Sequence, residues 1–215
     1  MRFRDRSEAG RLLAETLSGR VAPPCVVLAL PRGGVPVGRE IARALDCPLD
    51  LVMVRKIGVP HQPELAVGAV ANGEAPVLVV NEDVRRTAGI DESWLERTKA
   101  RELGEIARRR ARYLAGRAPA PVAGRTAIVV DDGVATGATT RAALRAVRRR
   151  GPRRLILAVP VAPPETLARL REEADEVVCL HAPEWFAAVG QFYDDFRQID
   201  DEEVVAALAE APPAD

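Results

Sequence analysis

The chain lacks the features by which many proteins bind through bulk charge or attach to a membrane. Basic and acidic residues are equal in number, 31 of each among 215 residues, so the formal net charge is zero. This balance argues against nucleic-acid or membrane binding through overall positive charge. No apolar run approaches the ~20 residues of a membrane-spanning helix. The charged start M-R-F-R-D-R leads into no apolar segment typical of a signal peptide. We therefore expect a cytoplasmic protein without a membrane partner.

Cysteine and histidine are scarce, and their spacing indicates no metal site. The three cysteines, Cys25, Cys47 and Cys179, lie far apart and lack a C-x-x-C pair. We expect no disulfide and interpret all three as small buried side chains in a reducing compartment. The histidines, His61 and His181, have no metal-ligand spacing. His61 is a candidate for a catalytic role because it lies in the glycine- and proline-containing segment Gly58–Glu64.

Short apolar runs alternate with segments of helical periodicity along the whole chain. Strands are predicted at Cys25–Leu30, Leu49–Val54, Pro76–Val80, Thr126–Asp131, Leu155–Val161 and Glu176–Leu180, with Leu65–Val70 as an additional candidate. Helices are predicted at 5–20, 35–45, 91–116, 138–150 and 164–173, and from Asp200 with a capping box to Glu203. This alternation predicts an α/β fold with a right-handed parallel sheet flanked by helices. Ligands of such sheets bind at the carboxyl ends of the strands.

One such strand end reads V-V-D-D-G-V-A-T-G-A-T-T over Val129–Thr140. Small residues there let backbone N–H groups approach a ligand, and the helix that follows directs its N-terminus at the same place, which favours a phosphate. Asp131 and Asp132 would repel a phosphate but could accept hydrogen bonds from sugar hydroxyls nearby. A strand–turn–helix junction with threonine caps has a similar composition. The order of strand, paired acids, loop and helix favours a pocket for a phosphorylated sugar.

This stretch resembles the 5-phosphoribosyl-1-pyrophosphate (PRPP) signature of type I phosphoribosyltransferases, which has four apolar residues, two acids, two variable residues and a phosphate loop. The resemblance implies a doubly wound fold with a small hood, here a single domain over 1–215 whose segments 1–22 and 181–215 form the hood. It implies that Asp131 and Asp132 bind the ribose hydroxyls. The implied 5′-phosphate loop consists of Ala135, Thr136, Gly137, Ala138, Thr139 and Thr140.

Two further turns resemble other loops of the same family. L-A-L-P-R-G-G resembles the pyrophosphate loop, which implies that Arg32 and Gly33 bind PRPP through a cis Arg32–Gly33 peptide. V-R-K-I-G is similar to a segment of adenine phosphoribosyltransferases, which implies that Arg55 and Lys56 offer positive charge to the pyrophosphate. Lys56 is one of only two lysines in the chain. Gly58–Glu64, which contains His61, matches the position of the mobile catalytic loop.

The implied activity is Mg²⁺-dependent transfer of phosphoribosyl from PRPP to a nitrogenous base with release of pyrophosphate. In such glycosyl transfer the bond at C1 breaks through an oxocarbenium-like state. Arg32, Arg55, Lys56 and the metal would neutralise the leaving group. Mg²⁺ would arrive with PRPP, with Asp131 and Asp132 as additional candidate ligands.

The acceptor base is not identified by these motifs. Oxopurine enzymes carry an acid at the position of Ala135, so its absence argues against hypoxanthine or guanine. Five of the eight aromatic residues lie within Trp185–Phe196, where Trp185, Phe186 and Tyr193 are candidates for stacking on a base. A packing cluster is the alternative interpretation.

Two other functions are compatible with the sequence. A non-catalytic regulator could sense PRPP or nucleotides and bind nucleic acid, which the row Arg108-Arg109-Arg110-Ala111-Arg112 suggests and the zero net charge opposes. A phosphohydrolase could use Asp131 as its nucleophile, although the adjacent acid pair argues against it. We expect a homodimeric phosphoribosyltransferase that binds PRPP and a base, without a nucleic-acid partner.

Overall fold

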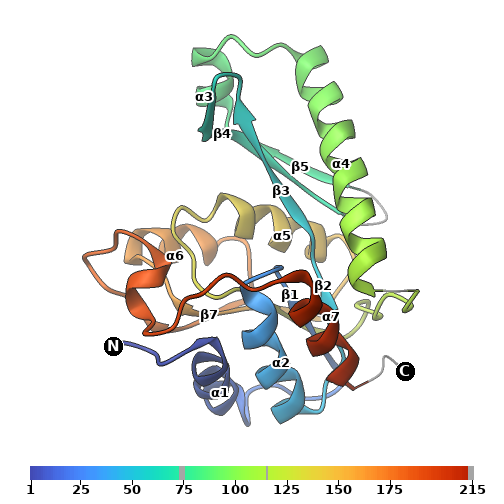
Figure 1. The fold of residues 1–215 in the computed structure, drawn as a ribbon, viewed down its shortest axis with the longest axis vertical. Coiled ribbons are helices and arrows are strands. Elements are labelled where there is room, and N and C mark those ends of the chain that lie inside the picture. The colour runs from blue at the N-terminus through green and yellow to red at the C-terminus, as the bar shows by residue number, and fades with distance from the viewer. Residues whose placement is uncertain (73–75, 115, 213–215) are drawn as a thin grey trace.

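The main sheet of the molecule has five parallel strands (Figure 1). The structure, a computed structural model, describes residues 1–72, 76–114 and 116–212, without the side chains of residues 63 and 64. In the order β2-β1-β6-β7-β8, the strands are β2 (Leu49–Leu51), β1 (Cys25–Ala29), β6 (Thr126–Val130), β7 (Arg154–Val161) and β8 (Glu176–His181). The predicted parallel α/β sheet is therefore confirmed.

Helices cover both faces of this sheet, as the unbroken apolar strands require. One face packs against α1 (Arg6–Leu17), α2 (Gly34–Leu45) and α7 (Asp201–Glu210), and the other against α5 (Ala138–Arg148) and α6 (Pro164–Leu170). Alternate residues of β1 serve the two faces: Val27 packs with Ile41 of α2, whereas Leu28 packs with Leu144 of α5. The predicted capping box of α7 is present, with Asp200 and Glu203 each accepting from the other's backbone N–H.

A second, antiparallel sheet projects from the core together with two helices (Figure 1). It has the order β3-β4-β5, built from β3 (Val54–Val59), β4 (Gln62–Ala71) and β5 (Val77–Val80), and is followed by α3 (Glu82–Thr87) and α4 (Glu92–Leu114). We call residues 54–114 the arm. The sequence predicted the strands Leu65–Val70 and Pro76–Val80, which match β4 and β5, but it did not predict that they pair with β3 in a separate antiparallel sheet.

The predicted mobile loop is part of this sheet. Gly58–Glu64 forms the end of the β3–β4 hairpin, with the register shifting on both sides of Gly58 and a turn at residues 60–61. His61 is exposed in that turn, with a positive φ of 62°. Backbone pairing between the strands, which local glycine and proline content does not reveal, converts the expected loop into a hairpin.

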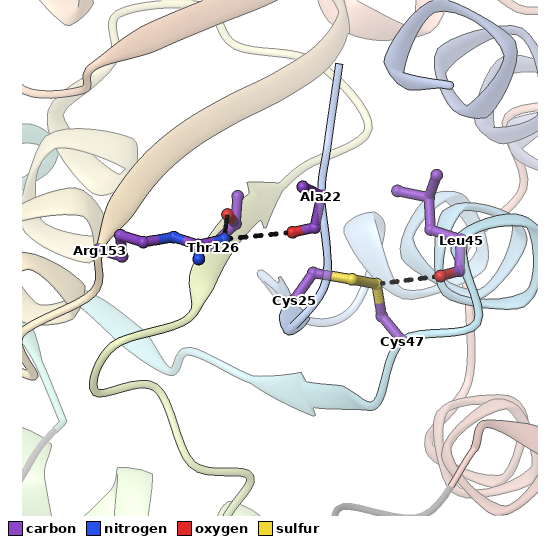
Figure 2. Close-up of a disulfide and its surroundings, with 6 residues drawn as sticks. All are labelled: Ala22, Cys25, Leu45, Cys47, Thr126 and Arg153. Carbon is purple, nitrogen blue, oxygen red and sulfur yellow. Dashed lines mark hydrogen bonds between the residues drawn. A yellow bond between two sulfur atoms is a disulfide. The ribbon is translucent and has the colours of Figure 1, made fainter. Parts of the chain in front are cut away.

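Cys25 and Cys47 form a disulfide, contrary to the expectation that all three cysteines are free. Cys25 begins β1 and Cys47 precedes β2, and these parallel strands pair in the register Val27↔Leu49. The cysteines therefore stand opposite each other two residues before that pair, with a Cα–Cα distance of 5.6 Å (Figure 2). Their separation of 22 residues concealed this proximity, which arises only when the α2 crossover closes. Cys179 is a free thiol.

The two terminal segments lie together beside the main sheet. Phe3 forms an isolated parallel bridge with Tyr193, and its N–H donates to the Phe192 carbonyl oxygen at 2.8 Å. Phe3 and Tyr193 are both buried in a small apolar cluster with Val161 of β7. Across 1–72, 76–114 and 116–212, no helix is both long and apolar enough to cross a membrane.

Candidate functional site

The candidate site lies where the strand order of the main sheet reverses. The chain moves from β1 to β2 on one side, and β6 then pairs with β1 on the other side. Ala29 and Val130, the last residues of β1 and β6, are register partners, so the segments that follow them leave the same edge side by side. Such a switch point is where open α/β sheets bind ligands. Both predicted glycine-containing turns meet there.

Two glycines allow the first turn to lie directly on the acid pair. A Cβ atom at Gly33 would overlap Oδ2 of Asp132, and one at Gly34 would be 2.7 Å from the Val130 carbonyl oxygen. Any side chain at either position would displace the neighbouring strand end. The Pro31–Gly34 turn and Asp132 therefore form one continuous surface.

The cis peptide of this turn is Pro31–Arg32, one position before the predicted Arg32–Gly33 bond. Gly33 already has the helical φ of −60° as the N-cap of α2, and the Gly34 N–H donates to the Leu30 carbonyl oxygen at 3.0 Å. Since the helix begins this early, the chain reverses within residues 31 and 32.

Asp131 and Asp132 are both half-buried, and their surroundings differ. Asp132 accepts a hydrogen bond at 2.8 Å from Nε of Arg6, whose side chain is only 9% exposed. Burial raises the pKa of Asp132, and Arg6 opposes that rise. Burial and the neighbouring Asp132 carboxylate raise the pKa of Asp131 well above its usual value. Asp132 is therefore the member of the pair whose charge a cation compensates.

Arg6 is a site residue that sequence reasoning missed. It donates from Nη1 to the Arg197 carbonyl oxygen at 2.9 Å, and its guanidinium carbon lies 3.9 Å from the centre of the Phe196 ring. One signal was available: Arg6 is the first residue of α1, directly after the N-cap Asp5. The positive end of a helix dipole disfavours a cation there, so another partner was to be expected.

The second turn forms a lysine-free loop that leads into α5. Gly137 is the N-cap of α5 with a φ of 79°, and a Cβ atom there would be 3.0 Å from Thr166. The Thr166 hydroxyl donates to the Ala135 carbonyl oxygen at 2.7 Å and holds the loop from behind. Ala135 and Thr136 are exposed, Ala138 and Thr139 are half-buried, and Thr140 is buried. The start of α5 is thus open to a ligand on the side of residues 135–139.

Arg55 and Lys56 do not reach the same place, although both were predicted to face the pyrophosphate. Nε of Arg55 donates to Glu102 of α4 at 2.9 Å, and Glu102 is only 8% exposed. Both residues belong to β3, and successive side chains of a strand point to opposite faces. Lys56 is therefore on the face away from Glu102, which is the face that packs on α5 at Val54. Arg55 is thus engaged by α4, because the segment that was predicted as a turn is a strand.

The three aromatic candidates for base stacking do not form one platform. Trp185 is 89% exposed, and Phe186 packs on Phe192 with ring centres 5.3 Å apart. Tyr193 is buried between Phe3 and Phe196, and its hydroxyl donates to the Asp132 carbonyl oxygen at 2.7 Å. The buried Tyr193 ring has no open face on which a base could stack. Its hydroxyl instead holds the backbone of Asp132 through this hydrogen bond.

The acid pair is the only donor set near the site that suits a metal ion among the described residues, and it has two members. Nowhere in 1–72, 76–114 and 116–212 do three Asp, Glu, His or Cys side chains gather in a way that could hold a metal. Mg²⁺ commonly binds through one or two carboxylates together with substrate phosphates. The residues present therefore fit a Mg²⁺ ion that arrives with a phosphorylated ligand.

Comparisons with known proteins agree on one family. The family model described as the phosphoribosyl transferase domain matches residues 7–197. Two Mycobacterium tuberculosis proteins, MT0597 of strain CDC 1551 and Rv0571c of strain H37Rv, are both named "Putative phosphoribosyl transferase". Each is 49% identical over 209 residues, which cover 97% of this chain and 47% of the relative. The chain thus spans about half the length of these relatives.

A solved structure is similar over its full length. The crystal structure of TT1426 from Thermus thermophilus superposes with a TM-score of 0.84 at 50% sequence identity. The match covers 98% of this chain and 99% of the TT1426 chain. The arm and the main sheet are therefore present together in another protein of nearly equal length.

Proposed function

Because the chain belongs to the phosphoribosyl transferase domain family, we propose that it transfers a 5-phosphoribosyl group from PRPP to a nitrogenous base and releases pyrophosphate in a Mg²⁺-dependent reaction. The observation that carries this proposal is the contact of Gly33 with Asp132 at the switch point. Because of this contact the acid pair lies between a glycine turn and the N-terminus of α5, which supports a site that holds pyrophosphate, ribose and phosphate in that order.

The acid pair would hold the ribose. Arg6 engages Oδ2 of Asp132 and compensates its negative charge, and the second oxygen can accept from a ribose hydroxyl. Asp131 would receive the other hydroxyl. Each of these hydrogen bonds fixes the sugar in place before the bond at C1 breaks, which lowers the entropic part of the barrier.

The loop at residues 135–139 would hold the 5′-phosphate. Its backbone N–H groups and the helix dipole of α5 favour a dianion, and Thr136 and Thr139 can add hydroxyl donors. Thr140 is 2% exposed and packs inside the protein instead. With the phosphate and ribose fixed, C1 lies toward the Pro31–Gly34 turn.

The leaving pyrophosphate would meet that turn, with Arg32 and Lys56 as its cationic partners. Asp131 and Asp132 would hold a Mg²⁺ ion that arrives with PRPP, and this ion would supply charge neutralisation for the leaving group. A closed environment prevents hydrolysis of the oxocarbenium-like state, and the base nitrogen attacks C1 with inversion. Ala135, in place of an acid, supports an acceptor other than a 6-oxopurine.

Calorimetry with PRPP and Mg²⁺ tests the binding step. We expect binding to the wild type and a loss of at least ~10-fold in affinity for the double variant Asp131→Asn plus Asp132→Asn. Equal PRPP affinity in both proteins would contradict the proposed site. A screen of purine, pyrimidine and pyridine bases for PRPP-dependent pyrophosphate release then tests catalysis. Binding without release from any base would favour a PRPP-sensing regulator.

A further inference from the structure

A hollow of about 150 Å³ lies between the Pro31–Gly34 turn, the last turns of α4 and the first turn of α7. Four of its five lining side chains are arginines: Arg32 from the turn, and Arg108, Arg109 and Arg112 from α4. The fifth is Asp201, the first residue of α7. The proposed reaction gives the α4 arginines no role. They nevertheless line the same hollow as Arg32, which lies beside the candidate site.

The acids around this hollow neutralise most of the positive charge but lie mainly outside it. Glu105 binds Arg108 and Arg109, each at 2.9 Å, and Glu202 binds Arg112 at 2.9 Å. With Asp201, these are three acids against four arginines, a net charge of one. Asp201 alone lines the hollow.

Asp201 lies where the positive charges converge. Its carboxylate is 2.5 Å from Arg112 and 3.9 Å from Arg32, and it accepts from the Tyr113 hydroxyl at 2.6 Å. The hydrogen bond from Tyr113 and the nearby arginines lower the pKa of Asp201. An oxyanion is thus already held at this point by two neighbouring donors of α4, with Arg32 of the turn as a more distant positive charge.

We propose that this four-arginine hollow binds a phosphoryl anion, a phosphate or pyrophosphate group, in competition with the Asp201 carboxylate. A water molecule occupies ~30 Å³ in the liquid, so the hollow holds about five, which suits a small anion and is too small for a nucleic-acid strand. Guanidinium groups bind phosphate oxygens in the same planar geometry as carboxylate oxygens, so the anion replaces Asp201 without rearranging its partners.

The hollow lies next to the proposed PRPP site. Anion binding in the hollow does not require the proposed reaction to be correct. Arg32 lines both the hollow and the turn that would receive the leaving pyrophosphate. The anion can therefore be the diphosphate of PRPP, extended toward α4, or a separate free anion. The acid pair at 131–132 is not part of the hollow, so failure of PRPP binding leaves this proposal testable.

Binding of inorganic pyrophosphate, measured by calorimetry without metal, tests the proposal. We expect Arg109→Gln to weaken binding about tenfold or more, since a charged hydrogen-bond donor is lost. Asp201→Asn should tighten binding several-fold, because it removes the competing charge and keeps an acceptor for Tyr113. Glu210→Gln is the matched control: it removes an equal charge from the same helix, α7, where Glu210 pairs with Arg39 away from the hollow, and it should change affinity less than twofold. Arg112 is left intact because it joins α4 to α7.

Two further experiments identify the source of the anion and distinguish this proposal from the proposed function. If saturating PRPP with Mg²⁺ blocks pyrophosphate and Arg109→Gln also weakens PRPP, the hollow extends the PRPP site; simultaneous binding marks a separate site. Pyrophosphate should still bind the Asp131→Asn plus Asp132→Asn protein. The proposal is overturned if the wild type binds no pyrophosphate, or if Arg109→Gln and Asp201→Asn, shown to be folded by their melting temperatures, bind it as the wild type does.

Discussion

At the scale of single residues, the two neighbouring acids have opposite relations to stability. Asp132 has a buried cationic partner in Arg6, whereas the largest effects on Asp131 are burial and the charge of Asp132. A buried charge without a partner of opposite sign costs stability. Removing one member of a buried ion pair also costs stability, because the remaining charge loses its partner. Two substitutions that look identical in the sequence should therefore act in opposite directions.

We predict that Asp132→Asn destabilises the protein by about 1–3 kcal/mol, because Arg6 loses its carboxylate. Asp131→Asn should raise the melting temperature at neutral pH. The raised pKa of folded Asp131 means that wild-type stability is lost as pH rises from the ordinary value of 3.8 through the folded value. The advantage of Asp131→Asn should thus be small near pH 4 and grow toward pH 8. Melting curves of the three proteins at both pH values check this, and a destabilised Asp131→Asn protein would contradict it.

Gly33 offers a second prediction at this scale. Its φ of −60° suits alanine, so the effect of Gly33→Ala comes only from the Cβ atom that would overlap Oδ2 of Asp132. The carboxylate must move away from Arg6, and a shift of this size in a positioning group can cost ~10²-fold in activity. We expect a matching loss of PRPP affinity by calorimetry.

Gly104→Ala is the control for Gly33→Ala. Gly104 lies inside α4, with open space around a Cβ atom. Alanine there should stabilise the protein by about 0.5–1 kcal/mol and leave PRPP binding unchanged. Equal PRPP affinity in the two glycine variants would show that the turn does not touch the ligand site.

At the scale of elements, β3 separates two cations that are adjacent in sequence. Arg55 binds α4 through Glu102, whereas Lys56 lies on the opposite face of the strand. We predict that Lys56→Gln lowers the rate of pyrophosphate release. Arg55→Gln should instead lower the melting temperature, because buried Glu102 loses a partner. Steady-state rates and melting curves of both variants check this; a reversed pattern would place Arg55 at the ligand.

The disulfide ties β1 to β2 at the edge of the sheet opposite the site. Closing a loop of 22 residues stabilises a fold by about 3 kcal/mol in the chain-entropy model. We predict that Cys25→Ser plus Cys47→Ser lowers the melting temperature by roughly 6–12 °C and leaves PRPP affinity unchanged. A reductant should shift the wild type by a similar amount, and Cys179→Ser should shift nothing. A wild type insensitive to reductant would argue against the bond.

Elements with strong local signals were predictable from the sequence, and those that depend on distant pairing were not. The apolar runs of β1 and β6, the Gly137 turn and the capping box at Asp200 each carry their own signal in the sequence. For β4 only Leu65–Val70 carried a strand signal; its full length and its antiparallel pairing depend on β3 and β5 on either side. At the site, the acid pair and both turns were predicted from their motifs. Arg6 was not predicted, and Tyr193 was predicted only as a candidate for base stacking, because their contacts with Asp132 span 126 and 61 residues of the sequence.

At the scale of the whole molecule, we propose that the arm and the main sheet form one folding unit. A single apolar cluster contains Ile57, Val70 and Ile106 of the arm together with Val27 and Ile128 of the main sheet. β3 also follows β2 after two residues. Shared packing of this kind couples the unfolding of the two parts.

The two tryptophans allow this coupling to be measured. Trp94 lies in the arm and packs on the shared cluster, whereas Trp185 is exposed and outside the arm. In a Trp185→Phe protein, fluorescence therefore reports the arm alone. We predict that its urea transition coincides with the loss of far-UV circular dichroism. An earlier fluorescence transition would mean that the arm unfolds by itself.

The meeting of Arg6, Asp132 and Tyr193 has a consequence for the nascent chain. The acid pair is synthesised in the middle of the sequence, when its cation from α1 has already been made. The hydroxyl that holds the Asp132 carbonyl oxygen follows 61 residues later. A chain on the ribosome therefore cannot complete this site until the segment around Tyr193 has left the exit tunnel. PRPP would then be a ligand of the finished fold and could not act as a template that helps the emerging chain to form it.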